Sequence, residues 1–141
     1  MLKISTPVDL IVINKRSQIL LVKRSEEEGF KDMWSIPGGG PEDGENYEIA
    51  LHREIKEELN CTIRKFSFFR SYSVKLSEAH LVRSIYFYGE IEGQIKINEE
   101  FSEFRWFDMN DSILSKLNFA FNQKQVVKDF ISFFTRKKRI K

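Results

Sequence analysis

Three glutamates, Glu54, Glu57 and Glu58, stand close together in the stretch REIKEE, which runs from Arg53 to Glu58. On a helix, which turns about 100° per residue, they fall within about 100° of one another. Carboxylates packed this closely repel one another unless cations lie among them, and hard divalent cations prefer carboxylate oxygens. The cluster therefore predicts a metal site. An exposed acidic helix face with ion pairs four residues apart is the alternative that it leaves open.

A glycine-rich segment, WSIPGGGPEDGE from Trp34 to Glu45, precedes this stretch. A proline is followed by Gly38, Gly39 and Gly40. Glycine has no Cβ, so bare backbone can approach a ligand there, and the start of a following helix offers N–H groups to an anion. The loop and the carboxylates together predict a site for a metal ion and a phosphate group.

A helix is predicted for residues 46–59, which contain no Gly or Pro and are rich in good helix formers. Apolar residues four apart should form the stripe that faces a sheet; they are Tyr47, Leu51, Ile55 and Leu59. Glu54 and Glu58 overlap the edge of this stripe. We therefore expect both carboxylates to be partly buried.

Apolar and β-branched runs predict the strands that must support this helix. Residues 8–14 and 19–24 flank a short polar turn and predict a hairpin. Further strands are predicted for residues 63–75, 80–91 and 104–107, and a closing amphipathic helix for residues 122–134. The order of strands, helix, strands and helix indicates a mixed α/β fold.

Composition favours one domain that covers residues 1–141, because 141 residues with 41% hydrophobic side chains can form a real core. The net charge of +2 lacks the broad basic excess of a nucleic-acid-binding protein, so we consider nucleic acid an unlikely partner. Residues 136–141, RKKRIK, are expected to form a solvated, frayed tail. Weak attraction of this tail to nucleic acid or anionic surfaces is the alternative.

The number of cysteines and the length of the apolar runs indicate the cellular compartment of the protein. Cys61 is the only cysteine, and with two histidines in the chain no His/Cys metal site is visible. The apolar run LIVI at residues 10–13 is too short to cross a membrane. We expect a soluble cytoplasmic protein.

The whole spacing resembles a known signature. Gly39, five residues, Glu45, seven residues and then REIKEE looks like the Nudix box, G-x5-E-x7-R-E-U-x-E-E-x-G-U, in which U is bulky and aliphatic. Asn60 stands where the family usually has Gly, and Cys61 where it has an aliphatic residue. Asn tolerates the left-handed conformation of a helix end, and Cys packs as a small hydrophobe. The resemblance implies an α/β class fold, a Nudix-type α/β/α sandwich around a mixed β-sheet.

The resemblance to the Nudix family also implies a reaction, the hydrolysis of a nucleoside diphosphate linked to another group with Mg²⁺ or Mn²⁺. It implies that Glu57 and Glu58 are metal ligands. Glu54 is either a ligand or the carboxylate that deprotonates the attacking water. The carbonyl of Gly38 is a further candidate ligand, and the backbone at Gly39 would meet the phosphates.

Four other residues receive roles from the same resemblance. Glu45 would support the metal shell, and Arg53 would brace the carboxylates, a simple surface ion pair being its alternative. Families of this type often add a glutamate from a distant loop, and Glu100 is our choice there over Glu99 and Glu103. Arg24 matches a phosphate-contacting arginine of MutT-like members, with a solvated cation at a strand end as its alternative.

The segment FAFNQKQVVKDF, residues 119–130, bears on the substrate. It resembles the part of MutT-type 8-oxo-purine nucleoside triphosphatases in which an Asn binds the base, and Asn122 falls on that position. It also resembles the closing helix of archaeal-type ADP-ribose pyrophosphatases, where Asn122 would be only a helix cap. Several aromatic side chains could stack a base or simply belong to the core; they are Phe30, Trp34, Phe119 and Phe121.

Three functions follow. The first is a MutT-like (8-oxo-)purine nucleoside triphosphate pyrophosphohydrolase, which releases a nucleoside monophosphate and pyrophosphate. The second is a Nudix pyrophosphatase for ADP-ribose, a dinucleoside polyphosphate or a nucleotide sugar. The third is a non-catalytic Nudix-fold binding module, although an intact carboxylate set argues against it. The expected partner is a small nucleotide, and the protein could be a monomer or a homodimer.

Overall fold

The computed structural model describes residues 1–25 and 30–140, except for the side chains of residues 139 and 140. The described chain divides into two compact units. The first comprises Met1–Val12 and Pro37–Asn98, and the second comprises Ile13–Ile36 and Glu99–Lys141. The chain therefore passes between the units three times, at residues 12–13, 36–37 and 98–99.

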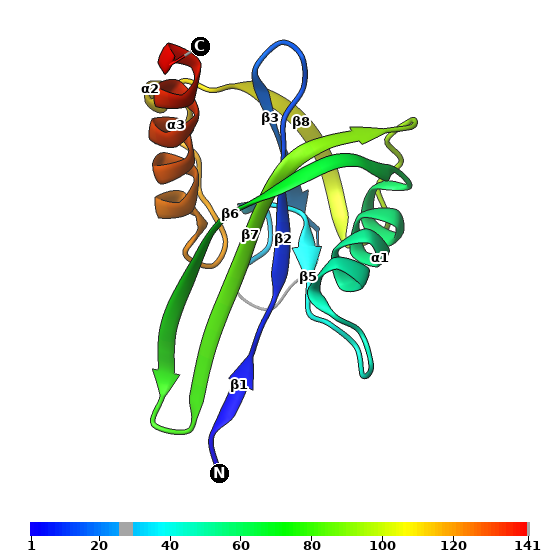
Figure 1. The fold of residues 1–141 in the computed structure, drawn as a ribbon, viewed down its shortest axis with the longest axis vertical. Coiled ribbons are helices and arrows are strands. Elements are labelled where there is room, and N and C mark those ends of the chain that lie inside the picture. The colour runs from blue at the N-terminus through cyan, green and yellow to red at the C-terminus, as the bar shows by residue number, and fades with distance from the viewer. Residues whose placement is uncertain (26–29, 141) are drawn as a thin grey trace. The chain divides into compact units, whose positions relative to one another are not determined.

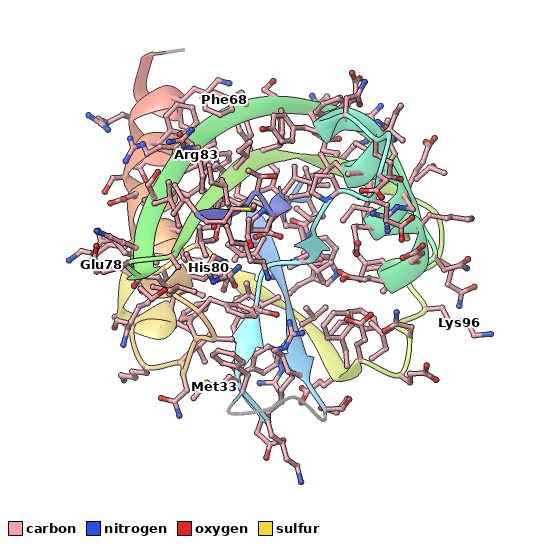
Figure 2. The ribbon with its side chains drawn as sticks, turned by 90° about the horizontal axis from the view of Figure 1, so that it is seen from below. Met33, Phe68, Glu78, His80, Arg83 and Lys96 are labelled. Carbon is pink, nitrogen blue, oxygen red and sulfur yellow. The ribbon has the colours of Figure 1, made fainter. Side chains whose placement is uncertain are left out.

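The first unit contains a five-stranded mixed sheet and helix α1, Tyr47–Leu59. Its strands are β1 (Lys3–Ser5), β2 (Val8–Val12), β5 (Gly38–Gly39), β6 (Thr62–Ser77) and β7 (His80–Glu92). β7 pairs in parallel with β1 and β2 and antiparallel with β6, whereas β5 pairs antiparallel with β2. Figure 1 shows β6 and β7 as a long hairpin, and Figure 2 shows Glu78 and His80 at the turn that joins them.

Helix α1 has clear local ends. The side chain of Asn46 accepts a hydrogen bond from the N–H of Ile49 and caps the start. Asn60, with φ of 59°, ends the helix in the left-handed conformation that Asn tolerates. Leu51, Ile55 and Leu59 are fully buried, as predicted. The helix predicted for residues 46–59 therefore begins one residue later than expected, because Asn46 is its cap.

The apolar stripe of α1 was predicted wrongly at its first residue. Tyr47 is exposed, and Ala50 and Leu51 are the buried residues of the first turns instead. Glu58 is buried with 3% of its surface exposed. The buried face of α1 therefore includes a carboxylate. Which residues a helix buries depends on what packs against it, and not only on which of its residues are apolar.

The second unit contains a three-stranded antiparallel sheet and two helices. The sheet has the order β4 (Trp34–Ser35), β3 (Gln18–Arg24) and β8 (Phe101–Asp108). The helices are α2, Asp111–Leu114, and α3, Gln123–Ile140. The centre of β3, residues 19–22, is fully buried, and so is Phe130 of α3. These residues form the core of this unit.

The hairpin predicted for residues 8–14 and 19–24 is wrong. Ile13 and Ile19 form one isolated bridge, after which the two strands join different sheets. β2 has β5 and β7 as its neighbours, and β3 has β4 and β8. Each strand thus has a partner on both sides, and beyond the isolated bridge neither is paired with the other. A short turn between two apolar runs cannot predict which partners those are.

The frayed tail predicted for residues 136–141 is also contradicted over most of its length, since α3 stays helical to Ile140. The Lys137 ammonium lies 5.9 Å from the Phe133 ring and that of Lys138 lies 5.2 Å from the Phe134 ring. Such contacts one turn apart, and cations near a helix C-terminus, stabilise the last turns. Lys141 lies outside the described residues.

None of the helices in the described part combines the length and hydropathy that crossing a membrane requires.

Candidate active site

The first unit brings the glycine segment against the carboxylates of α1. A Cβ placed on Gly39 would lie 2.6 to 2.8 Å from the carboxyl atoms of Glu54. The N–H of Gly38 donates a 3.0 Å hydrogen bond to Oε1 of Glu58. Both carboxylates therefore touch bare backbone, and only glycine leaves room for Glu54 in its present position.

Gly38 is constrained from another direction. Its φ is 151°, and an added Cβ would lie 2.1 Å from Oδ1 of Asp9 and 2.3 Å from the carbonyl oxygen of Val8. Asp9 pairs with Gly38 in the sheet and is buried. Sequence reasoning missed Asp9, although an acidic residue inside the apolar run VDLIV was a signal, because buried carboxylates are rare and costly.

Arg53 joins the carboxylates to the loop. Its Nε and Nη2 donate to the two oxygens of Glu45 at 2.7 and 2.9 Å, and Nη2 also donates to the carbonyl of Gly40 at 3.0 Å. Its Nη1 donates to Oε1 of Glu54 at 2.9 Å and to Oε2 of Glu57 at 3.2 Å. One guanidinium thus donates hydrogen bonds to three glutamates and one carbonyl oxygen, so it orders both the helix face and the glycine segment.

These contacts shift two ionisation equilibria. The hydrogen bond from Arg53 lowers the pKa of Glu45, and the backbone N–H of Glu42 lowers it further. The same hydrogen bond to Glu45 raises the pKa of the Arg53 guanidinium. The Arg53 side chain is only 19% exposed, and that of Glu45 only 14%. The pair is therefore charged and partly shielded from water, where a forked arginine–carboxylate contact is strongest.

The donor set is chemically suited to a hard divalent cation, because it consists of carboxylate and carbonyl oxygens. Each carboxylate has two oxygens, and the Arg53 contacts described above engage one oxygen of Glu54 and one of Glu57. However, no group of three or more His, Cys, Asp or Glu side chains within residues 1–25 and 30–140 is arranged to hold a metal ion by itself. A cation here would thus need water or phosphate oxygens beside those of the protein, as Mg²⁺ commonly does.

Three other residues singled out in the sequence belong to the second unit. Arg24 is the last residue of β3; its Nη1 donates to Oγ of Ser35 at 3.3 Å, and its guanidinium lies 5.7 Å from the Phe101 ring and 5.3 Å from the Phe121 ring. Glu100 is exposed in the turn before β8, and its carbonyl accepts a 2.9 Å hydrogen bond from Ser25. Asn122 is exposed directly before α3.

The aromatic side chains separate into two kinds. Trp34 is buried, with its ring 5.1 Å from that of Phe107, and belongs to the core. Phe121 is 57% exposed, and its ring centre lies 4.5 Å from that of Phe30.

Sequence reasoning missed Gln123, which is buried and accepts a 2.8 Å hydrogen bond from the N–H of Ile36. A single glutamine in a helical pattern gave no signal of such a distant contact.

Comparison with known proteins agrees with this geometry. The NUDIX domain matches residues 4–130 of the chain. An ADP-ribose pyrophosphatase from Methanocaldococcus jannaschii is 34% identical over 122 residues, which are 85% of this chain and 69% of that protein. The nucleoside triphosphatase NudI of Escherichia coli is 32% identical over 121 residues, which are 77% of this chain and 86% of NudI.

Solved structures confirm the expected α/β fold of Nudix type. A MutT structure from work on the Aliivibrio salmonicida and Vibrio cholerae proteins has a TM-score of 0.78 and 26% identity, covering 92% of this chain and 98% of that one. MutT of Methanosarcina mazei has the same TM-score at 24% identity, over 97% and 96% of the two chains, and so supports the fold alone. The chain therefore belongs to the NUDIX domain family and is a MutT-like Nudix pyrophosphohydrolase that acts on nucleoside diphosphate derivatives.

Proposed function

We propose that the protein is a divalent-metal-dependent nucleoside triphosphate pyrophosphohydrolase. It would release a nucleoside monophosphate and pyrophosphate and prefer purine nucleotides, 8-oxo-purines among them. The observation that carries the hydrolytic part is the Arg53 network, which links Glu45, Glu54 and Glu57 to the carbonyl of Gly40. A chain that only bound nucleotides would have no need for this repulsive carboxylate set.

The reaction is substitution at phosphorus by water, in which negative charge spreads over phosphoryl oxygens. Bound Mg²⁺ or Mn²⁺ would neutralise that charge and make the attacking water more acidic. Glu54 is our candidate for the group that orients and deprotonates this water. Its carboxylate lies against Gly39 and accepts a hydrogen bond from Arg53, and these contacts hold the side chain in place for that role.

The proposed metal ligands are Glu57, Glu58 and the carbonyl of Gly38, with Glu54 as a further candidate. Glu58 is held by the N–H of Gly38, and the two residues are thereby kept together. Glu45 acts through Arg53, since both of its oxygens accept from the guanidinium. Glu100 is a proposed additional ligand from a distant loop, as its place in the sequence suggests.

Substrate recognition is proposed for three residues. The bare backbone at Gly39 would lie beside the phosphates, and the Arg24 guanidinium would contact a phosphate oxygen. Asn122 would bind the purine edge, because an amide can donate and accept at once. Its exposed position leaves its amide accessible. The similarity to NudI, which is named a nucleoside triphosphatase, supports the triphosphate as the substrate class.

ADP-ribose is the second candidate substrate. The similarity to the Methanocaldococcus jannaschii protein, which is named an ADP-ribose pyrophosphatase, favours it. Dinucleoside polyphosphates and nucleotide sugars contain the same diphosphate linkage and belong to the same alternative.

We further propose that residues 1–141 act as one Nudix domain. We also propose that the protein is found in the cytoplasm, because its single cysteine favours a reducing compartment.

A substrate panel tests the proposal. The protein is incubated with purine and pyrimidine triphosphates, 8-oxo-purine triphosphates, ADP-ribose, a dinucleoside polyphosphate and a nucleotide sugar, each with Mg²⁺ or Mn²⁺, and the products are identified. Monophosphate plus pyrophosphate from a purine triphosphate supports it. AMP plus ribose phosphate, with triphosphates left intact, would replace it by the second candidate. Full activity in excess chelator would contradict the metal requirement.

A further inference from the structure

Residues 118–120 form an isolated parallel bridge with Trp34, the first residue of β4. The N–H of Trp34 donates to the carbonyl of Asn118, and the carbonyl of Trp34 accepts from the N–H of Ala120, both at 2.8 Å. Trp34 and Phe119 are the paired residues of this bridge. The segment before α3 is thereby attached to the strand that leads into Pro37 and the glycines.

The side chain of Gln123 adds a hydrogen bond beside this bridge that the backbone does not supply. The next donor that points the same way is the N–H of Ile36, directly after β4, and it donates to Oε1 of Gln123 at 2.8 Å. The carbonyl of Ala120, which a regular parallel ladder would use there, instead accepts from the N–H of Gln123 at 3.4 Å. Gln123 is 3% exposed and Ile36 is 4% exposed. A hydrogen bond so deeply buried is costly to break and strongly constrains its two ends.

Two exposed residues lie between this bridge and Gln123. Phe121 has a φ of 58°, a conformation that is uncommon and unfavourable for a bulky side chain. Its exposed ring contacts Phe30 and lies near the Arg24 guanidinium. Asn122 follows it and is also exposed. The two anchored ends hold the turn in this strained form, with an aromatic ring and an amide both presented at the surface.

We propose that Gln123 is a positioning residue for nucleoside recognition: its amide oxygen holds the Phe121–Asn122 turn against Ile36, directly after β4, and so sets which base the enzyme prefers. This inference rests on the proposed function, because it takes a nucleotide as the substrate. Gln123 acts through the turn and not by contact with the base. A buried glutamine with a purely structural role would affect stability and leave selectivity unchanged.

The experiment compares three variants in the full chain. Gln123→Met removes the acceptor, whereas Gln123→Glu keeps an acceptor oxygen at the same distance along the side chain. Gln125→Met is the matched control, because Gln125 lies on the same helix, is exposed and donates to Asp129. Protection of the Ile36 amide from hydrogen exchange shows whether its hydrogen bond to residue 123 is intact. Selectivity is the ratio of kcat/KM values for the two nucleotides that the wild type distinguishes most.

The proposal expects Gln123→Met to lose protection of the Ile36 amide and to change the selectivity ratio by about fivefold or more. Gln123→Glu should keep the protection and hold the ratio within about twofold of the wild type, and Gln125→Met should change neither. If Gln123→Met does not fold, Gln123→Asn takes its place, because the shorter side chain of Asn cannot bring its oxygen to Ile36.

Two results would overturn the inference. One is an unchanged ratio in a folded variant that has lost protection at Ile36, which would make Gln123 purely structural. The other is full protection of Ile36 in Gln123→Met, which would make the hydrogen bond unnecessary. A wild type that hydrolyses no nucleotide would instead refute the proposed function, so the two failures are distinguishable.

Discussion

Arg53 and Glu45 form a forked ion pair, with Nε donating to Oε2 at 2.7 Å and Nη2 to Oε1 at 2.9 Å. Arg53 lies on α1 and Glu45 lies in the segment that follows the glycines, so this contact fixes the loop to the helix that carries the carboxylates. Planar, two-point contacts of this kind require arginine, because the single ammonium of lysine cannot reproduce them.

Replacing Arg53 by lysine should therefore slow turnover. Arg53→Lys keeps the charge but loses the fork, and we expect kcat to fall by on the order of 10- to 100-fold, because Glu54 and Glu57 lose a shared donor. Steady-state kinetics measures this. Arg64→Lys is the control, since Arg64 pairs with Glu90 on the exposed hairpin. Equal losses in both variants would contradict the role of Arg53.

The same ion pair should make stability depend on pH. Arg53 lowers the pKa of Glu45 below its ordinary value of 4.5. The carboxylate of Glu45 therefore contributes fully to stability above pH 4.5, and the contribution is lost as the pH falls through the lowered pKa. The melting temperature of Glu45→Gln should lie below that of the wild type at pH 7, and the difference should shrink below pH 4.5. A difference that stays constant down to pH 2, or an equal effect in the exposed control Glu48→Gln, would refute this.

Glu57 tests the metal site with least risk to the fold, because its side chain is 54% exposed. Glu57→Gln preserves volume but removes a proposed ligand, and turnover should fall by about 100-fold or more. Millimolar Mg²⁺ or Mn²⁺ should raise the melting temperature of the wild type by mass action, and raise that of Glu57→Gln less. A wild-type melting temperature that is identical with and without metal would count against a site on this helix.

Gly39 and Gly40 are adjacent and should respond differently to alanine. A Cβ on Gly39 would lie within 2.6 to 2.8 Å of the Glu54 carboxyl group, whereas one on Gly40 would have nothing within 4 Å. Gly39→Ala should displace the Glu54 carboxyl group, the far end of a flexible side chain, and therefore lower kcat by about tenfold or more with little loss of stability. Gly40→Ala should leave both nearly unchanged. Thermal melting and kinetics decide, and equal tolerance at the two positions would contradict the close contact with Glu54.

Asn122 tests the purine preference. Loss of a base hydrogen bond costs roughly 1–3 kcal/mol, so Asn122→Ala should lower kcat/KM for the preferred purine triphosphate by about tenfold or more and reduce discrimination against pyrimidines. Because Asn122 is exposed, the melting temperature should change little. If the purine-to-pyrimidine ratio is unchanged and stability falls by about 1 kcal/mol, Asn122 is a helix cap, and the broader family of diphosphate-linked substrates becomes the better assignment.

Local features of this protein could be determined from the sequence. The helix at residues 47–59 follows from a run of good helix formers without Gly or Pro, and the structure adds only that Asn46 caps its start. The proximity of Arg53, Glu54 and Glu57 follows from helical spacing alone, because neighbours one turn apart need no distant contact to meet. Adjacent apolar runs likewise predicted the strands β6, β7 and β8.

Contacts between distant residues were decided only by the tertiary structure. The sequence could not show that β2 and β3 enter different sheets, because equally apolar strands can pair with any suitable edge. Nor could it show that Asp9 lies over Gly38, or that Gln123 accepts from Ile36, 87 residues away. Helical periodicity and caps act within a few residues, whereas these contacts depend on which strands pair and which polar groups must be satisfied once buried.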